Sequence, residues 1–555
     1  MIIRSKLLSS LVKVFKDTDP ICQPECCKLT ALRGESVSFQ VAYLSDEDAT
    51  VTVAVESDFG KKVTVRSVEY VPVRHPGYPQ HMADDGNYMT RVGGEFPDYL
   101  RALHCSKLKL TANEYRTLWI EVEIGSKVKP GDYPITVALM GEDGTELSRV
   151  SQGITVYNAT LPKAKLTHTE WFHTDCIADY YGYEVFDEKH WDAIGNFMKT
   201  ASKRGINMIL TPVFTPPLDT AVGGERTTVQ LVDVKVHCGK YSFNFDKLHR
   251  WVQVAQENGI EFFEISHFFT QWGAAAAPKV MATVNGKYKR IFGWDTPVAD
   301  GVYPEFLKLF VPALVAELKA MGIADKCYFH VSDEPGMDHF DAYCKAKSII
   351  APYLEGFKII DALSKIDFYK TGAVAHPIPC TNHIEPFLAE DIKERWTYYC
   401  CSQGLKVSNR FMALPLARTR AIGVQMVKYN ISGFLQWGYN FYNSQYSKEK
   451  IDPYVTNDAG TVSGSIAPAF PAGDPFVVYP GKGGKPEESI RLLAFYNAQT
   501  DLRALQALAE KTSYEHVMEL IESELSFSIT FSEYPASDYY YINLRNRVNK
   551  ELADE

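Results

Sequence analysis

The strongest constraint on the fold of this chain is a regular alternation, between residues 167 and 439, of short apolar runs and longer amphipathic segments. Strands that alternate with helices in this way are typical of a parallel sheet covered by helices. Eight apolar runs can be counted, and eight repeats favour a closed (β/α)8 barrel of the TIM type over an open sheet. The predicted strands are 167–173, 207–211, 261–269, 327–333, 358–363, 373–378, 396–401 and 433–439, and the predicted helices are 188–204, 246–258, 305–321, 338–353 and 413–429.

The segments on either side of this repeat predict a multidomain protein. From residue 35 to residue 157, short runs of alternating polarity are separated by turns, which is typical of an antiparallel β-sandwich. Beyond residue 445, a stretch rich in Gly and Pro is followed by helical patterns at 487–511, 514–526 and 537–552. We therefore expect an N-terminal β-sandwich domain (1–160), a (β/α)8 catalytic barrel (161–445) and a C-terminal α/β appendage (446–555).

Composition and charge argue against several classes of function. The formal net charge is −10, and no cluster of Lys and Arg is of the kind that binds phosphates, so we expect no nucleic-acid partner. No run approaches the ~20 apolar residues of a membrane span. The N-terminal segment carries Lys and Arg within its apolar stretch, unlike a signal peptide, so we expect a cytoplasmic protein without a membrane partner. The spacing of Cys and His does not resemble a zinc site, and we expect no metal and no cofactor.

Two adjacent carboxylates stand out at one strand end. In a (β/α)8 barrel, catalytic residues lie at the carboxyl ends of the strands, and the fourth predicted strand ends in HVSDEPG, which places Asp333 and Glu334 at the barrel mouth. Pro335 suits the turn into the next helix, because proline lacks an N–H and fixes φ. One interpretation is structural, with Asp333 as a helix cap and Glu334 in an ion pair. The position after the fourth strand favours the alternative that both are catalytic.

The adjacency of the two carboxylates narrows the chemistry. Glycosidic cleavage needs an acid for the leaving oxygen and a group that stabilises positive charge at the anomeric carbon, and the usual pair faces the sugar from two sides, about 5 to 9.5 Å apart. Neighbouring residues present both groups from one side. This suits a sugar whose own 2-acetamido oxygen is the nucleophile, with Glu334 as acid and base and Asp333 orienting the amide. Repulsion between the two is expected to keep Glu334 protonated near neutral pH.

Other strand ends and two long loops supply candidate substrate-binding residues. Aromatic residues make up 13% of the chain, and flat apolar ring faces can stack on sugar rings. The loops 211–245 and 270–304 are long enough for substrate walls or lids, or alternatively for subunit contacts in a homo-oligomer. Each candidate side chain, taken alone, is also explained by packing. The predicted substrate-binding residues are Trp171, His173, Trp272, Trp294, Asn382, Tyr399, Trp437, Tyr439 and Asn440.

Three stretches of the chain carry a resemblance to a known family. They are HVSDEPG at 330–336, GFLQWGYNFYN at 433–443 and GDPFVVYPGKGGKPEESIRLLAFYNAQTDLRAL at 473–505. They resemble glycoside hydrolase family 123, the β-N-acetylgalactosaminidases, and the likeness covers most of residues 30–525. The resemblance implies a retaining, substrate-assisted reaction in which Asp333 stabilises the intermediate and Glu334 is acid and base. We expect Asp474 and Arg491 to support the barrel mouth.

The leading hypothesis is an exo-acting glycosidase that removes terminal β-linked N-acetylgalactosamine from an oligosaccharide or glycoconjugate. One alternative keeps the barrel and changes the sugar, to β-linked GlcNAc or to a hexose that lacks the acetamide. Another is a non-catalytic carbohydrate-binding protein, although the presence of both carboxylates counts against it. Fold alone does not decide among these, because (β/α)8 barrels host many chemistries.

Overall fold

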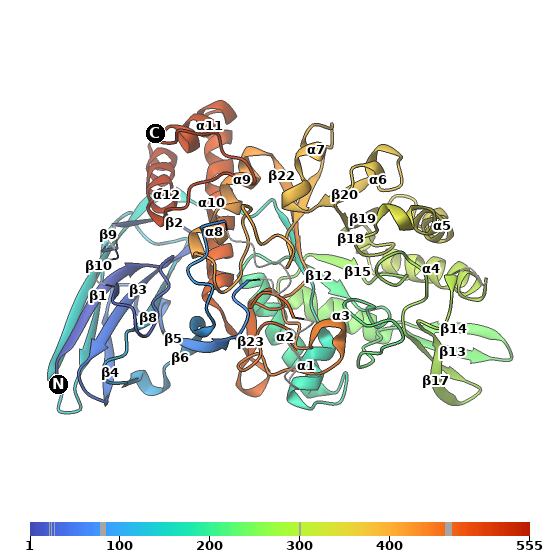
Figure 1. The fold of residues 1–555 in the computed structure, drawn as a ribbon, viewed down its shortest axis with the longest axis horizontal. Coiled ribbons are helices and arrows are strands. Elements are labelled where there is room, and N and C mark those ends of the chain that lie inside the picture. The colour runs from blue at the N-terminus through green and yellow to red at the C-terminus, as the bar shows by residue number, and fades with distance from the viewer. Residues whose placement is uncertain are drawn as a thin grey trace.

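The structure is a computed structural model that describes residues 1–20, 23, 25–26, 28–77, 85–298, 301–460 and 469–554. In Figure 1 the N-terminal strands lie on the left, a barrel of strands and helices lies on the right, and the C-terminal helices lie at the top. Helix α10 (Ile490–Lys511) stands between the N-terminal strands and the barrel. Within the described ranges, every helix is too short or too polar to cross a lipid bilayer.

The N-terminal part is rich in strands, as predicted, and its described residues form two five-stranded sheets. The first has the order β1-β3-β8-β5-β6, and the second has the order β2-β10-β9-β4-β7. Side chains from both sheets share one buried cluster, for example Phe39 and Ile120 from the first and Val53 and Val137 from the second. The strands are β1 (Ile3–Ser9), β2 (Leu29–Arg33), β3 (Glu35–Ser45), β4 (Ala49–Glu56), β5 (Val63–Val73), β6 (Gly94–Ala102), β7 (Lys107–Leu110), β8 (Arg116–Ile124), β9 (Gly131–Met140) and β10 (Glu146–Thr160).

One pair of these strands departs from the predicted antiparallel arrangement. β2 runs parallel to β10, whereas the other pairs in the two sheets are antiparallel. Alternating polarity shows that a segment is a half-buried strand, but it carries no information about the direction of the neighbouring strand. The parallel pair could therefore not be read from the sequence.

The central part is a nearly closed barrel whose described residues form an eight-stranded parallel sheet. Neighbours in the sheet follow the order of the chain, and β22 pairs with β11. A parallel bridge between Cys380 and Tyr398 joins the two remaining edges. Each predicted strand overlaps one of the observed strands, which are β11 (Thr167–Glu170), β12 (Met208–Thr211), β15 (Phe262–Ile265), β18 (Cys327–Phe329), β19 (Lys358–Leu363), β20 (His376–Pro379), β21 (Arg395–Tyr398) and β22 (Ile431–Gln436).

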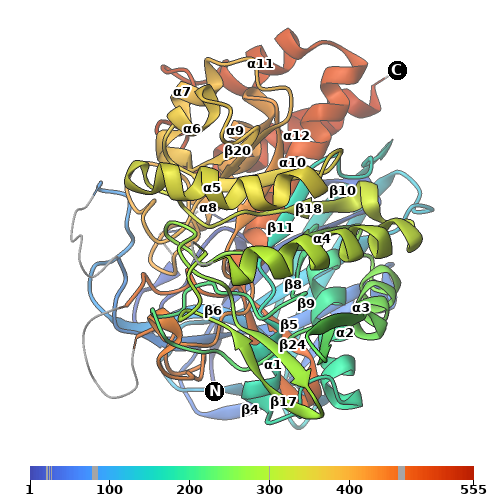
Figure 2. The ribbon, with the colours of Figure 1, turned by 90° about the vertical axis from the view of Figure 1, so that its right-hand side faces the viewer.

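Helices lie between consecutive barrel strands, and α2 shows why they form. Asp187 accepts a hydrogen bond from the backbone N–H of His190, which caps the first turn. Apolar residues at helical spacing, including Ile194, Phe197 and Met198, are buried against the barrel. Figure 2 shows α4 and α5 side by side on the outside of the barrel. The helices are α1 (Thr174–Tyr181), α2 (Glu188–Lys203), α3 (Asp246–Glu257), α4 (Val302–Ala320), α5 (Phe340–Ile350), α6 (Asp367–Lys370), α7 (Glu385–Leu388), α8 (Leu416–Arg420) and α9 (Ile422–Lys428).

The two long loops each contain a hairpin. The loop after β12 carries β13 (Asp233–His237) and β14 (Lys240–Asn244), and the loop after β15 carries β16 (Val280–Val284) and β17 (Lys287–Phe292). β13 pairs with β16, so the hairpins join in one small sheet. In the sequence, the run 228–236 followed by the turn Cys238-Gly239-Lys240 predicts the first hairpin, whereas the second was not predicted. The paired hairpins fix the outer ends of both loops, whose inner ends reach the mouth of the barrel.

The C-terminal segment packs closely on the rest of the protein. After the short strands β23 (Val478–Pro480) and β24 (Pro486–Glu488) come α10, α11 (Tyr514–Glu522) and α12 (Asp538–Ala553). Side chains of α10 share a buried cluster with Trp119 of β8 and Phe434 of β22. At the start of α10, the buried Arg491 pairs with Asp98 of β6 (2.7 Å) and donates to the carbonyl oxygen of Gly473 (2.6 Å). This helix therefore ties the N-terminal sheets to the segment beside the barrel mouth.

Candidate active site

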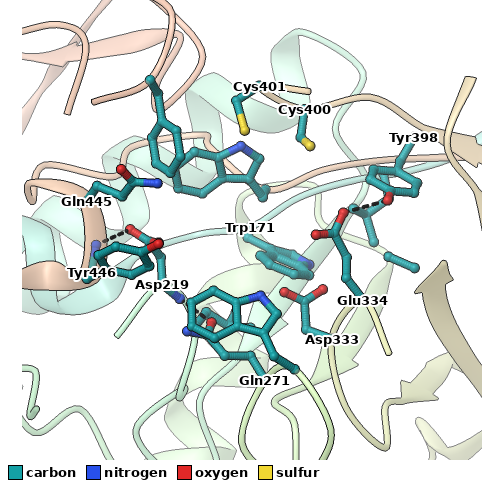
Figure 3. A pocket seen from close by; sticks show the side chains of 16 residues that line it. Trp171, Asp219, Gln271, Asp333, Glu334, Tyr398, Cys400, Cys401, Gln445 and Tyr446 are labelled. Carbon is teal, nitrogen blue, oxygen red and sulfur yellow. Dashed lines mark hydrogen bonds between the residues drawn. The ribbon is translucent and has the colours of Figure 1, made fainter. Parts of the chain in front are cut away.

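A pocket of about 790 Å³ opens at the carboxyl ends of the barrel strands. This volume includes space that is open to the solvent at the mouth of the barrel. Figure 3 shows its walls, which come from the ends of several strands, from the two long loops and from the segment after β22. The lining residues are Trp171, Leu218, Asp219, Gln271, Trp272, Asp333, Glu334, Ala362, Tyr398, Cys400, Cys401, Leu435, Trp437, Gln445, Tyr446 and Phe470.

Asp333 and Glu334 lie together on one side of this pocket (Figure 3). The backbone N–H of Trp272 donates to the carbonyl oxygen of Asp333 (3.1 Å), and the hydroxyl of Tyr398 donates to Oε1 of Glu334 (2.5 Å). Across the described residues, Asp333 caps no helix and Glu334 forms no salt bridge. The alternative interpretation, a helix cap with an ion pair, does not describe this site.

The two carboxyls share an environment that favours retention of a proton. Burial, and next the charge of Glu334, raise the pKa of Asp333 well above its usual value. Burial also raises the pKa of Glu334, while the hydrogen bond from Tyr398 acts in the opposite direction. Because two neighbouring like charges resist simultaneous ionisation, the pair favours retention of a proton. The charge of Glu334 raises the pKa of Asp333, whereas burial raises that of Glu334, so the repulsion expected to act on Glu334 acts on Asp333 instead.

A buried network of charged groups lies beneath the pair. Nε2 of His330 donates to Oε1 of Glu264 (2.6 Å), and Nδ1 of His330 lies 3.2 Å from Oδ1 of Asp361. The same Oε1 of Glu264 also accepts from the indole N–H of Trp171 (2.8 Å). A histidine between two carboxylates donates from both nitrogens and is an imidazolium. Although burial opposes it, hydrogen bonding to Asp361 and Glu264 raises the pKa of His330 to about 9.

His267, His330 and Asp361 form the single grouping with metal-ligand character among the described residues, with ligand atoms within 4.8 Å of one another. Both nitrogens of His330 already face carboxylates. The rings of His267 and His330 are stacked with centroids 4.2 Å apart and planes 22° apart. Because a nitrogen lone pair lies in the plane of its ring, two nearly parallel stacked rings are poorly placed to bind one ion. This geometry fits a hydrogen-bonded charge network better than a metal centre.

Comparison with known proteins identifies the family. The family model described as "Glycoside hydrolase 123, catalytic domain" matches residues 171–508, which is more than half of the 555 residues. The chain belongs to glycoside hydrolase family 123. The resemblance that the three sequence stretches carry is therefore confirmed, and the protein is a glycosidase by family. No curated protein matches the chain.

Solved structures support the fold of this family 123 glycosidase. A family 123 glycoside hydrolase from Clostridium perfringens, described in a study of glycolipid glycan hydrolysis, is 16% identical. The match covers 99% of this chain and 98% of that chain, with a TM-score of 0.75. A β-glucuronidase from Parabacteroides merdae is 9% identical over 90% of this chain and 53% of that chain, with a TM-score of 0.28, which is too low to support an argument.

Three of the predicted binding residues line the pocket of this family 123 glycosidase: Trp171, Trp272 and Trp437. The indole N–H of Trp171 is held by Glu264, and that of Trp437 donates to Oδ2 of Asp474 (2.9 Å). Trp272 is 39% exposed. The first two rings are therefore fixed by buried carboxylates, and all three offer faces on which a sugar ring could stack.

The other six predicted binding residues do not line the pocket. Three are buried behind it: the ring of His173 contacts the carbonyl oxygen of Trp437, the side chain of Asn440 bonds to the backbone of His173, and Tyr439 donates to the carbonyl oxygen of Phe197. The remaining three lie elsewhere. Tyr399 packs outside the barrel near α10, Asn382 bonds to Gln403, and Trp294 lines a separate hollow on the surface.

The structure adds pocket residues that were not predicted as binding residues, notably Asp219, Gln271, Gln445, Tyr446 and Phe470. Asp219 and Gln271 belong to the two long loops, whose length was the available signal for a substrate wall. The other three follow β22 in an irregular segment. Their approach to the pocket depends on how that segment folds back over the barrel.

Backbone strain is concentrated around the pocket. Four lining residues other than glycine have positive φ angles: Asp219 (40°), Trp272 (57°), Glu334 (42°) and Tyr446 (63°). Such residues are uncommon, and they persist where surrounding contacts enforce them, often at functional sites. The strain supports the assignment of this pocket as the active site.

Proposed function

We propose that this family 123 glycosidase is a retaining exo-enzyme that removes terminal β-linked N-acetylgalactosamine with help from the substrate's own 2-acetamido group. The observation that carries the proposal is the common placement of Asp333 and Glu334 on one side of a walled pocket. A two-sided carboxylate mechanism would need its second group across the sugar ring. A third carboxylate, Asp219, lies across the pocket from Glu334 and accepts a hydrogen bond from the backbone N–H of Tyr446. We propose that the acetamide oxygen, and not Asp219, supplies the nucleophile.

The proposed steps use the two carboxyls in different ways. Glu334 donates its proton to the glycosidic oxygen while the acetamide oxygen attacks the anomeric carbon, so the glycosidic C–O bond breaks and the aglycone leaves as an alcohol. Asp333 accepts a hydrogen bond from the acetamide N–H and stabilises the positive charge of the resulting oxazolinium ion. The Glu334 carboxylate then takes a proton from a water molecule whose oxygen attacks the anomeric carbon. The bond between the anomeric carbon and the acetamide oxygen breaks, which restores the acetamide and gives net retention. Tyr398, at 2.5 Å from Oε1 of Glu334, holds that carboxyl in place through both steps.

An acetamide N–H directed at Asp333 would also place the shared proton. It would stabilise the Asp333 carboxylate, because a hydrogen bond to the charged form lowers a pKa. The proton of the pair would then reside on Glu334, where the reaction needs it. Binding of an acetamido sugar would thus place the proton on Glu334, which is then ready to act as the general acid.

The shape of the pocket supports exo action on a glycoconjugate. Trp171, Trp272 and Trp437 are among the walls of the pocket, and we propose that one terminal sugar binds between them. The related Clostridium perfringens enzyme was described through glycolipid glycan hydrolysis. We propose an oligosaccharide or glycoconjugate substrate of comparable chemistry here.

We also propose the type of barrel, the type of N-terminal domain and the domain boundaries. The order of strands and helices supports a (β/α)8 barrel, and the cluster shared by the N-terminal sheets supports a β-sandwich. We propose the boundaries 1–160, 161–445 and 446–555 for the three parts. Separate expression of the N-terminal part would test the first boundary.

A panel of 4-nitrophenyl glycosides tests the function. We expect cleavage of the β-GalNAc substrate and little cleavage of the matching 2-hydroxy β-galactoside. Glu334→Gln should lose activity most strongly on substrates with poor leaving groups, and Asp333→Asn should lose it only on acetamido sugars. Equal rates on acetamido and hydroxy sugars would favour a different β-glycosidase. Sugar binding without turnover of any substrate would favour a carbohydrate-binding protein.

A further inference from the structure

The pocket has an unusual balance of charge. Three of its lining residues carry carboxyl groups, namely Asp219, Asp333 and Glu334, and no Lys, Arg or His lines it among the described residues. A site that binds a sulfate, phosphate or carboxylate ordinarily supplies Arg, Lys or a helix N-terminus for the anion. The described lining residues therefore supply no positive charge that would compensate a negative charge on the bound sugar.

The buried cations around the pocket are committed to other partners. His330, beneath the catalytic pair, lies between Glu264 and Asp361. Arg226, behind the pocket wall, forms hydrogen bonds with both oxygens of Asp175 (2.6 and 2.8 Å). Arg410 pairs with Glu170 (2.9 Å) and donates to the carbonyl oxygen of Gly438 (2.6 Å). Releasing either side chain toward a ligand would leave a buried carboxylate unpaired, which is costly.

Asp219 is the carboxylate of this set with no part in the proposed proton transfers. Its Oδ2 accepts from the backbone N–H of Tyr446 (2.9 Å), its own N–H donates to Oε1 of Gln271 (2.6 Å), and its carbonyl oxygen accepts from the hydroxyl of Ser447 (2.7 Å). These contacts hold it at a φ of 40°. Among the described residues no side chain or backbone group bonds to its Oδ1.

Figure 3 places Asp219 on the opposite side of the pocket from Glu334. A sugar that stacks on the tryptophans and presents its glycosidic oxygen to Glu334 would have its far edge near Asp219. The groups on that edge of a neutral sugar are hydroxyls, and a hydroxyl donates well to a carboxylate oxygen. Above about pH 7, where Asp219 is ionised, a sulfate or carboxylate on the same edge would meet it with like charge.

From this arrangement we infer that the pocket selects terminal sugars without an anionic substituent, and that Asp219 sets this selection by binding a hydroxyl group of the sugar. The inference rests on the proposed function and narrows its substrate class to uncharged N-acetylhexosaminides. O-sulfated hexosaminides and uronic acids are excluded as terminal sugars. Anionic groups farther along the glycan, outside the pocket, are not excluded.

The wild-type enzyme provides the first test. The substrates are 4-nitrophenyl β-GalNAc and its 4-O-sulfate and 6-O-sulfate. We expect kcat/KM on at least one sulfated substrate to be lower by at least about 100-fold, because uncompensated like charge costs several kcal/mol. Rates within about threefold of the neutral substrate for both sulfates would overturn the inference.

Asp219→Asn provides the second test, with Glu225→Gln as a matched control in the same loop. Glu225 is exposed and pairs with Lys279 and Arg290 outside the pocket. We expect Asp219→Asn to lower kcat/KM on the neutral substrate by about 10- to 100-fold, the value of a charged hydrogen bond. Asp219→Asn should also reduce the ratio of kcat/KM on the neutral substrate to kcat/KM on the sulfated substrate at least tenfold. Glu225→Gln should leave both values of kcat/KM unchanged. Unchanged selectivity in Asp219→Asn would overturn the role of Asp219.

Two further measurements distinguish this inference from a role of Asp219 as the nucleophile and from the proposed function itself. If Asp219 were instead the nucleophile, azide would restore turnover of Asp219→Asn and yield a glycosyl azide, which would overturn the inference. Calorimetry with methyl β-GalNAc and its sulfates on Glu334→Gln measures selection without turnover. Charge-selective binding there, with no cleavage of β-GalNAc by the wild type, would support the inference while refuting the proposed function.

Discussion

Replacement of Asp219 by Asn should stabilise the protein at high pH and not at low pH. Burial raises the pKa of Asp219 from 3.8 to about 7. A carboxyl that binds its proton more tightly when folded destabilises the protein as pH rises from the unfolded pKa to the folded one. With 1.36 kcal/mol per pKa unit, the full loss reaches about 4 kcal/mol above pH 7, as an upper limit. Asn keeps an oxygen for the N–H of Tyr446 and cannot ionise.

The assay is thermal unfolding of wild type and Asp219→Asn at pH 5 and pH 8, at one scan rate. The increase in the free energy of unfolding of Asp219→Asn over wild type should be about 2 to 3 kcal/mol larger at pH 8 than at pH 5. An unfolding entropy of roughly 2.1 cal/mol/K per residue converts this to about 2 to 3 °C for a chain of 555 residues. Glu225→Gln should show no such gain. A variant that is less stable at pH 8 than at pH 5, relative to wild type, would refute the reasoning.

Three further predictions concern the groups around the catalytic pair. Tyr398→Phe removes the 2.5 Å hydrogen bond to Glu334, so the pKa of that carboxyl should rise. The alkaline limb of the pH profile of kcat/KM should therefore move to higher pH, and kcat/KM should fall by about tenfold. Trp437→Ala should raise KM and lower kcat/KM by about 10- to 100-fold on aryl glycosides, because a stacking face is lost, while Phe should restore most of the activity. His330→Gln should lower the free energy of unfolding by about 3 to 5 kcal/mol in urea titrations, because it leaves the Glu264 and Asp361 carboxylates uncompensated; an unchanged midpoint would contradict the charge network.

The barrel strands were predictable because each is a short apolar run followed by a polar strand end. The run 327–333 already located Asp333 and Glu334 at the mouth of the barrel, and this position follows from strand polarity alone. Residues in the loops were harder to place. Asp219 lies between β12 and β13 and is held at the pocket by hydrogen bonds with Gln271 and Tyr446, and no periodicity of the sequence records these contacts.

A different difficulty arises within the strands. Successive side chains of a strand point to opposite faces, so a prediction that is out of phase by one residue selects the wrong neighbour. Tyr399 was predicted as a binding residue, whereas Tyr398 packs inside the barrel and bonds to Glu334. Tyr399 faces outward, near Phe495 of α10. Two adjacent tyrosines in an apolar run give no signal of phase, because both faces of a barrel strand are buried.

The central claim is that the substrate's acetamide, rather than an enzyme carboxylate, attacks the anomeric carbon. It is tested most directly by kcat/KM of the wild type on 4-nitrophenyl β-GalNAc analogues whose acetamide carries zero, one, two or three fluorines. Fluorine withdraws electron density from the carbonyl oxygen and leaves the rest of the sugar nearly unchanged. We predict a steep fall in rate with each added fluorine. Rates that do not change across the series would contradict substrate assistance and point to a carboxylate such as Asp219 as the nucleophile.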